Sequence, residues 1–247
     1  MSSPAKTYQN EMHGNLGFFA TWLPSDSLDI GDVGVLEGGR FRKLSSLTDL
    51  EIKFSVSPKG PPQDLRYTST SGTTLTVGGA APVANIPGVS AEIKIAFSHE
   101  GSFLFHASNV RNAKLENVAA LCESILNAYA RGQWKKEWYL IDSLHTAECA
   151  TIVVTEGSSS GLVLAASADV SLGTMPLADP RVQLSVSSSS GKMLQIVASR
   201  NLRPLYSCLR LKHSWFSDPS VAPVRGKARA TSELPVAKPP IAELLGS

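Results

Sequence analysis

The chain has 247 residues, of which 18% are charged, and its formal net charge is +2. A chain of this length can bury enough surface to fold as one large domain without a disulfide or a metal. Its near-neutral charge argues against a nucleic-acid-binding protein, which would carry a basic excess on one face.

Cys122, Cys149 and Cys208 form no CxxC pair, which argues against a zinc ribbon and favours the reducing cytoplasm. Residues 1–10 are polar and lack the apolar region of a secretory signal. No run of about 18 apolar residues is present to form a transmembrane helix. We therefore expect a soluble cytoplasmic protein, any part of which would enter a bilayer as strands.

The N-terminal region predicts short strands. The apolar stretch 16–23 is followed by Pro24, which predicts a strand closed by a turn. Residues 31–36 and 40–44 flank two adjacent glycines, which predicts a β-hairpin. Residues 65–77 are rich in serine and threonine and predict a solvent-exposed strand pair.

The clearest strand lies at 91–98, where apolar and charged residues alternate, so that one face is apolar. A turn is predicted at 99–101, after which the alternation continues. The two segments therefore predict an antiparallel hairpin with one buried face. Its large apolar positions are Ile93, Ile95, Phe97, Phe103 and Phe105.

An amphipathic helix is predicted from Ala113 to Arg131. Apolar residues recur there at spacings of three and four, which makes one apolar stripe. Asn112 is expected to cap the start of the helix, and Gly132 occupies the position of a C′ glycine.

Strands follow at 138–141, 151–155 and 162–165, with the Ser/Gly segment 157–161 as a hairpin loop between the last two. Their alternating apolar positions include Ile152, Val154, Leu162 and Leu164. A further hairpin is predicted from 181–186 and 192–198, and a last strand at 205–212. The pattern indicates an α+β fold, mainly an antiparallel twisted sheet with one central amphipathic helix and a few short helices.

The composition changes after Phe216, because residues 217–247 are rich in proline and lack apolar periodicity. We expect a single domain over 1–216 and a flexible C-terminal tail over 217–247. The tail contains a small basic cluster with Arg225 and Arg229, and a short apolar end formed by Ile241, Leu244 and Leu245.

One segment matches the G-x-S-x-G pattern of a hydrolase, with Ser159 as the nucleophile and Asp179 and His213 following in the chain. That motif requires a sharp strand-to-helix turn, whereas a strand is predicted to follow here. The alternative interpretation, a hairpin loop, is therefore favoured.

Metal and thiol sites also have simpler interpretations. His99 and His106 would supply two ligands across a hairpin, fewer than zinc requires. Cys122 lies on the apolar face of the predicted helix and is interpreted as a small buried hydrophobe. We expect no enzyme activity, no metal and no cofactor.

The order of elements is distinctive. A strand pair ending in Glu100–Phe105 precedes the amphipathic helix, then come Gly132–Trp134 and the aromatic strand Trp138–Asp142, then more amphipathic strands and the tail. This order, over residues 16–212, resembles the pore-forming domain of the gasdermin family, particularly its short bacterial members. Bacterial gasdermins typically carry a lipid-modified cysteine near the N-terminus, and this chain has none there.

The resemblance implies a latent pore-forming protein. Gasdermins are stored as soluble monomers held by a C-terminal inhibitory segment, which a protease removes. The freed domain oligomerises on membrane lipids and unfurls strands into hairpins that line a pore. For this chain it implies a cytoplasmic latent monomer, an activating protease, and a homo-oligomer in the cell's inner membrane that acts in cell death or antiphage defence.

Particular residues take roles under this resemblance. Arg225 and Arg229 would be cleavage sites, and Ile241, Leu244 and Leu245 would dock the tail. Residues 91–109 and 151–170 are long enough to rebuild as spanning hairpins. The candidate membrane-inserting positions are Ile93, Ile95, Phe97, Phe103, Phe105, Ile152, Val154, Leu162 and Leu164.

Two other functions remain open. A non-enzymatic protein-binding or assembly module would have a rigid core, an accessory tail and no effect on lipids. A hydrolase would need Ser159 on an elbow before a helix, with His213 within reach.

Overall fold

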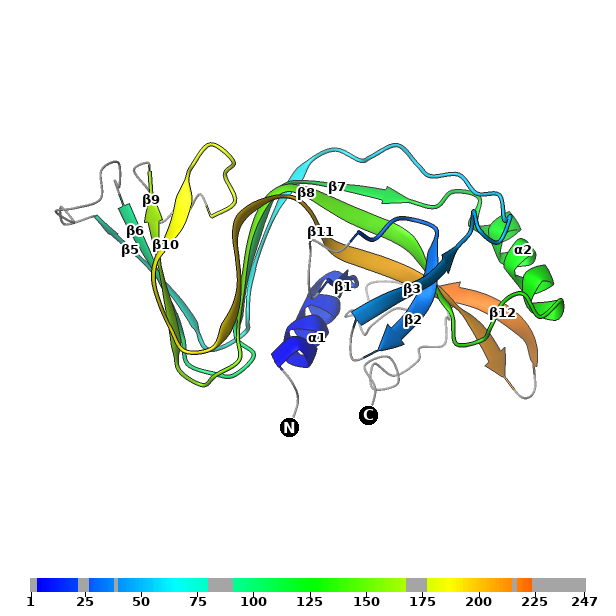
Figure 1. The fold of residues 1–247 in the computed structure, drawn as a ribbon, viewed down its shortest axis with the longest axis horizontal. Helices are drawn as coiled ribbons and strands as arrows, with labels where there is room; N and C mark the ends of the chain where they lie inside the picture. Colours follow the sequence, from blue (N-terminus) through cyan, green and yellow to red (C-terminus); the bar gives the residue numbers. More distant parts are fainter. Residues whose placement is uncertain are drawn as a thin grey trace, which may run out of the picture. The chain divides into compact units, whose positions relative to one another are not determined.

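The computed structural model describes residues 4–21, 27–37, 40–79, 91–167, 177–214 and 217–223, traced in Figure 1. Antiparallel strands dominate these residues and two helices accompany them, which confirms the predicted α+β class. The chain forms two compact units. Unit 1 comprises Met1–Tyr8, Pro62–Val110 and Ala147–Leu202, and unit 2 comprises Gln9–Pro61, Arg111–Thr146 and Arg203–Ser247.

The helices are α1, Pro4–Leu16, and α2, Val118–Ala130. The strands in chain order are β1 Phe19–Ala20, β2 Asp32–Glu37, β3 Arg40–Ser46, β4 Gln63–Thr68, β5 Thr73–Gly79, β6 Ala91–Phe97, β7 Phe103–Lys114, β8 Tyr139–Thr155, β9 Ser160–Ala166, β10 Leu184–Ser190, β11 Met193–Ser214 and β12 Ser217–Pro223. The long strands β7, β8 and β11 have residues in both units.

One sheet has eight strands, in the order β1-β11-β8-β2-β3, with β12 also paired to β11, and β7 paired to both β8 and β4. Within unit 2, β2 and β3 form the hairpin predicted from the two adjacent glycines, and Glu37 pairs with Arg40 at its end. β2 also pairs with β8 through Val33 and Leu140.

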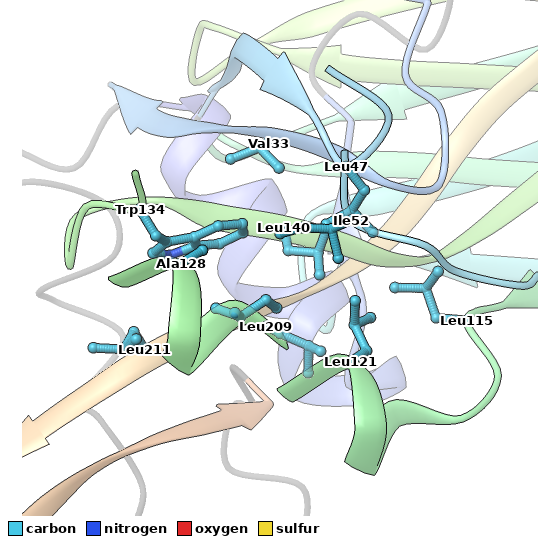
Figure 2. Packing of buried hydrophobic residues seen from close by; sticks show 11 residues of the cluster. Val33, Leu47, Ile52, Leu115, Leu121, Ala128, Trp134, Leu140, Leu209 and Leu211 are labelled. Carbon is cyan, nitrogen blue, oxygen red and sulfur yellow. The ribbon is translucent and has the colours of Figure 1, made fainter. Parts of the chain in front are cut away.

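The core of unit 2 lies between α2 and these strands, as Figure 2 shows. Leu121, Ile125 and Ala128 are the buried residues of α2, spaced four and three residues apart on one helical face. They belong to one cluster with Leu140 of β8 and Leu209 of β11. Truncation of such a buried leucine to alanine costs about 2–5 kcal/mol, so this cluster stabilises unit 2.

The predicted helix exists but begins later than expected. The structure starts α2 at Val118, because residues 103–114 belong to strand β7. Asn112 therefore does not cap it; its side-chain oxygen accepts a hydrogen bond from the Ser143 hydroxyl at 2.9 Å. Asn117 occupies the N-cap in the left-handed region, with φ of 51°. Gly132, at φ of +74°, follows the helix as predicted.

Two elements, α1 and β12, differ from what the sequence predicted. Helix α1 occupies a segment that the sequence indicated only as polar, and it buries Tyr8 and Met12, four residues apart, completely. Strand β12 occupies the first seven residues of the segment interpreted as a tail and pairs with β11.

Several predicted hairpins were wrong. β6 pairs with β5 and β9, whereas β7 pairs with β4 and β8, so the segment 99–101 does not reverse the chain into a β6–β7 hairpin. β8 and β9 are likewise in different sheets, as are β10 and β11, and β4 and β5. Each of these four connections leads from one sheet into another.

Candidate functional site

A four-stranded antiparallel sheet in unit 1, here called the distal sheet, gathers most of the predicted membrane-inserting residues. Its order is β10-β9-β6-β5. β5 and β6 are consecutive paired strands, β9 and β10 are another such pair, and β6 joins the two pairs by pairing with β9. In this register Ile93 lies opposite Leu164, and Ile95 opposite Leu162.

One face of the distal sheet is apolar and buried. Ile93, Ile95, Leu162 and Leu164 are each at most 1% exposed. They pack in one cluster with Leu104 of β7, Val153 of β8 and Leu177, and with the partly buried Met193 and Val197 of β11. The apolar face is therefore covered by residues of the larger sheet and of the segment after 176, all within unit 1.

The opposite face is polar. Thr74 and Thr76 of β5 and Lys94 of β6 are exposed, and Lys94 lies between Thr76 and Val163 in the register. On β10 a bulge between Val186 and Ser188 places serines opposite β9 on this face. The distal sheet thus has two chemically distinct faces, as the alternation in β6 predicted.

The structure divides the nine predicted residues into two sets. Ile93, Ile95, Phe97, Leu162 and Leu164 lie together in the distal-sheet cluster. Phe103, Phe105, Ile152 and Val154 are buried in β7 and β8, at positions that alternate with the cluster members Leu104 and Val153. Side chains alternate across a strand, so this second set faces away from that cluster. Phe103 packs edge-on against Tyr8 of α1, with ring centroids 5.0 Å apart.

Each strand of the distal sheet continues a strand of the larger sheet, and the lateral order is the same in both. The distal order β5-β6-β9-β10 corresponds to β4-β7-β8-β11 in the larger sheet. Four short segments, here called the break row, separate them: 69–72, 98–102, 156–159 and 191–192. Four chain paths, 63–79, 91–114, 139–166 and 184–214, therefore run side by side with one interruption each.

The hydrolase interpretation does not match the geometry. Ser159 lies in the break row, and strand β9 follows directly at Ser160, so no strand-to-helix elbow forms. Asp179 forms an ion pair with Arg181 at 2.8 Å. The side chain of His213 lies outside the described residues.

The histidine pair and the thiols show no reactive arrangement in the described part of the chain. His99 is in the break row, and His106 lies in β7 opposite Arg66 of β4, so the two do not face each other across a hairpin. Across the described residues, no group of three or more His, Cys, Asp or Glu side chains is placed to hold a metal ion. Burial raises the pKa of the Cys122, Cys149 and Cys208 thiols.

The predicted tail residues Arg225, Arg229, Ile241, Leu244 and Leu245 lie outside the described residues. Of the helices in the described ranges, neither is long and apolar enough to cross a membrane.

No protein-family model matches the chain, and no curated protein matches it in sequence. Among solved structures, the chain is similar to the gasdermin A3 membrane pore determined by cryo-EM, with 11% identity, a TM-score of 0.38, and 89% of this chain and 94% of that chain covered. It is also similar to a bacterial gasdermin from Bradyrhizobium tropiciagri, with 10% identity, a TM-score of 0.38, and coverage of 91% and 92%. Both of these solved structures are gasdermins. Because identities and TM-scores are low, the likeness carries no residue assignment to this chain.

Proposed function

We propose that this protein is a latent pore former, released by proteolysis of its C-terminal segment and active as a homo-oligomer in membranes. In this proposal the latent monomer is cytoplasmic, the active form acts at the cell's inner membrane, and its role is cell death or antiphage defence. The observation that carries the proposal is the distal sheet, two adjacent hairpins with one apolar and one polar face.

The two faces suit a strand-lined pore. In a bilayer every backbone group must be hydrogen-bonded within the protein, and spanning strands turn apolar side chains to lipid and polar ones to water. Ile93, Ile95, Leu162 and Leu164 would face lipid, and Lys94 and its neighbours would face water. In the present structure the lipid-facing set is buried within the protein, as a latent form requires.

The edges of the distal sheet explain why an oligomer is needed. In the described strands, β5 and β10 each pair on one side only. Unpaired strand edges are not tolerated in hydrocarbon, and four strands are too few to close on themselves. Pairing of β10 in one copy with β5 in the next would satisfy both edges.

The C-terminal segment is the proposed restraint. Cleavage at Arg225 or Arg229 would remove the apolar end formed by Ile241, Leu244 and Leu245, which we propose docks onto the domain in the latent state. Strand β12 ends at Pro223, ahead of both arginines, so cleavage would spare every strand of the eight-stranded sheet.

The test is dye release from phosphatidylglycerol-containing liposomes, before and after limited trypsin digestion, with the cut mapped by mass spectrometry. We expect leakage only after loss of about twenty C-terminal residues. The matched control is a variant with Arg225, Lys227 and Arg229 all changed to glutamine, which should stay intact and leave the liposomes sealed. A trimmed wild-type protein that remains monomeric and releases no dye would refute the proposal and favour a protein-binding module.

A further inference from the structure

Unit 1 contains a second candidate site, a cavity of about 370 Å³. Its walls are residues 64–66 of β4, residues 106–108 of β7 and the segment 178–181, none of which has a role in the proposed pore. Pockets that bind small ligands have volumes of about 300–1,000 Å³. The cavity is therefore large enough for a small metabolite, and the groups that line it decide which kind.

The walls of the cavity are fixed by hydrogen bonds within unit 1. Ser108 Oγ of β7 donates to the carbonyl oxygen of Ala178, which holds the segment 178–181 against β7. Within that segment Arg181 donates to the Asp179 carboxylate through Nε at 3.0 Å and Nη2 at 2.8 Å. The cavity thus has its shape before a ligand enters, which lowers the cost of binding.

A bulge in β7 lies beside the cavity, because the register of β4 against β7 shifts between Gln63 and Leu65. Asn109 in this bulge has φ of 50°, in the left-handed region. Its backbone N donates to Asp64 Oδ1 at 3.0 Å. Bulges commonly re-aim side chains next to functional sites. This bulge holds one carboxylate oxygen of Asp64, while Oδ2 accepts no hydrogen bond from the described residues.

Asp64 and Arg66 bring two opposite charges to the cavity. They are two residues apart in β4, so they share a face of the strand at a spacing of about 7 Å. Both side chains are exposed, and neither forms an ion pair within the described ranges. The charges of Asp179 and Arg181 cancel in their own ion pair. An unpaired anion and an unpaired cation in one cavity suit a ligand that carries both charges.

The imidazole of His106 also lines the cavity, and His106 lies opposite Arg66 in the register. It is 7% exposed, and its Nδ1 has no hydrogen-bond partner in the part of the chain that the structure describes. Buried polar atoms are nearly always hydrogen-bonded, so a polar group of a ligand would supply the missing partner. Burial and the nearby Arg66 lower the pKa of His106 to about 4. The ring is therefore neutral at pH 7 and does not repel an ammonium group.

We propose that this cavity binds a small zwitterion, a molecule with one ammonium and one anionic group, such as a free amino acid. Arg66 binds the anionic group, whose oxygens match the fork of the guanidinium. Asp64 Oδ2 accepts hydrogen bonds from the ammonium, and His106 bonds to a polar atom of the ligand. Because the ligand contacts only the folded protein, it stabilises unit 1. The site goes beyond the proposed pore and adds a small-molecule signal to it.

The test is isothermal titration calorimetry on the intact full chain at pH 7.5. Glycine, L-alanine and γ-aminobutyrate are the zwitterionic probes, and acetate and methylamine each carry one of the two charges. We expect at least one zwitterion to bind with a Kd of about 1 mM or lower. It should bind about tenfold more tightly than either singly charged probe, because only the zwitterion satisfies both Asp64 and Arg66.

One further probe identifies the source of the ligand. An ethanolamine phospholipid carries the same two charges in its headgroup, so phosphoethanolamine is titrated in parallel. Binding of phosphoethanolamine with no binding of the amino acids would support the zwitterion site and assign it to a headgroup. Binding of an amino acid with no binding of phosphoethanolamine would support the site and assign it to a free metabolite.

Two variants test the assigned residues. Arg66→Gln and Asp64→Asn should each raise the Kd of the zwitterion about tenfold, because each removes one charge-assisted contact. Asp64→Asn keeps an oxygen that can accept from Asn109 N, so the bulge is retained. The matched control is Arg131→Gln, which replaces an exposed arginine that follows α2 in unit 2 and should leave the Kd unchanged. Far-ultraviolet circular dichroism verifies that all three variants fold.

Three results would overturn the proposal. The first is equal affinity for the zwitterions and the singly charged probes, and the second is wild-type affinity in both Arg66→Gln and Asp64→Asn. The third is the absence of measurable binding by every zwitterion, phosphoethanolamine included. None of these results depends on whether the cut protein releases dye, so the site and the pore are tested separately.

Discussion

Three buried histidines make the folded protein sensitive to mild acid: His106, His145 and His13, whose pKa burial also lowers. His106 of β7 is 7% exposed and His145 of β8 is 3% exposed, and Nδ1 of each has no hydrogen-bond partner among the described residues. Burial, with the nearby charge of Arg66 as a smaller cause, lowers the pKa of His106 from 6.5 to about 4. Burial lowers the pKa of His145 to the same value of about 4.

The direction in which stability changes with pH follows from proton binding. Because the folded-state pKa is the lower one, the unfolded chain binds more protons between pH 6.5 and 4, so stability falls as the pH falls through this window. At pH 5 the loss is about 2 kcal/mol for each of His106 and His145, and at pH 4 about 3 kcal/mol. A domain has only about 5–15 kcal/mol of stability, so these two histidines together remove a large part of it by pH 4.

The assay is urea denaturation followed by far-ultraviolet circular dichroism at pH 7.5, 6 and 5. His106→Leu should reduce the loss between pH 7.5 and 5 by about 2 kcal/mol, because leucine does not titrate and the contributions of His145 and His13 remain. His99→Leu is the control, because it removes an exposed histidine and leaves the buried histidines in place. An unchanged pH dependence in His106→Leu would refute the reasoning.

Two further predictions concern the β2–β3 hairpin. Asp32 is 2% exposed and pairs with Lys43 at 2.6 Å, so Lys43→Ala should lower the free energy of unfolding by about 1–2 kcal/mol, because it leaves a buried carboxylate without its cation and because the half-exposed Lys43 is partly screened by water. Arg42→Ala breaks an exposed pair with Glu37 and should change the urea midpoint little. Equal effects of the two substitutions would contradict the burial argument. A Cβ at Gly34 would overlap the backbone carbonyl of Arg42, so Gly34→Ala should lower the free energy of unfolding by about 3 kcal/mol. Gly14 in α1 has open space around it, so Gly14→Ala should raise the free energy of unfolding by about 0.5–1 kcal/mol. An unchanged stability in Gly34→Ala would show that the hairpin can shift to accommodate the methyl group.

The sequence predicted those elements whose signal is local. The apolar stripe that includes Cys122 and Ile125 predicted α2, since helical periodicity requires no knowledge of partners. Alternation at Ile93 and Ile95 predicted a strand with one buried face, and the two glycines at 38–39 predicted the β2–β3 hairpin. In each case the residues that decide the structure are neighbours in the chain.

The connections were misread because their signal is not local. A polar segment with glycine between two alternating runs, such as 98–102, looks the same whether the chain reverses or bends onward into a second sheet. The choice depends on which strands lie beside it, and β6 takes its partner β9 from more than sixty residues away. Helix α1 had a usable signal, Pro4 at its first position, but its buried side includes the polar Gln9 and His13, which conceals an apolar stripe.

The position of β11 has a consequence for biosynthesis. β11 pairs with β1, β8 and β12, and Thr21 Oγ1 donates to Arg203 O across 182 residues of sequence. Contacts of such long range form slowly, and a nascent chain lacks them until β11 has emerged from the ribosome. Neither β1 nor β8 can therefore pair with β11 until that strand is synthesised, near the end of translation. Until then the distal hairpins lack Met193 and Val197 as cover, and the unfinished chain exposes apolar strands of the kind that aggregate.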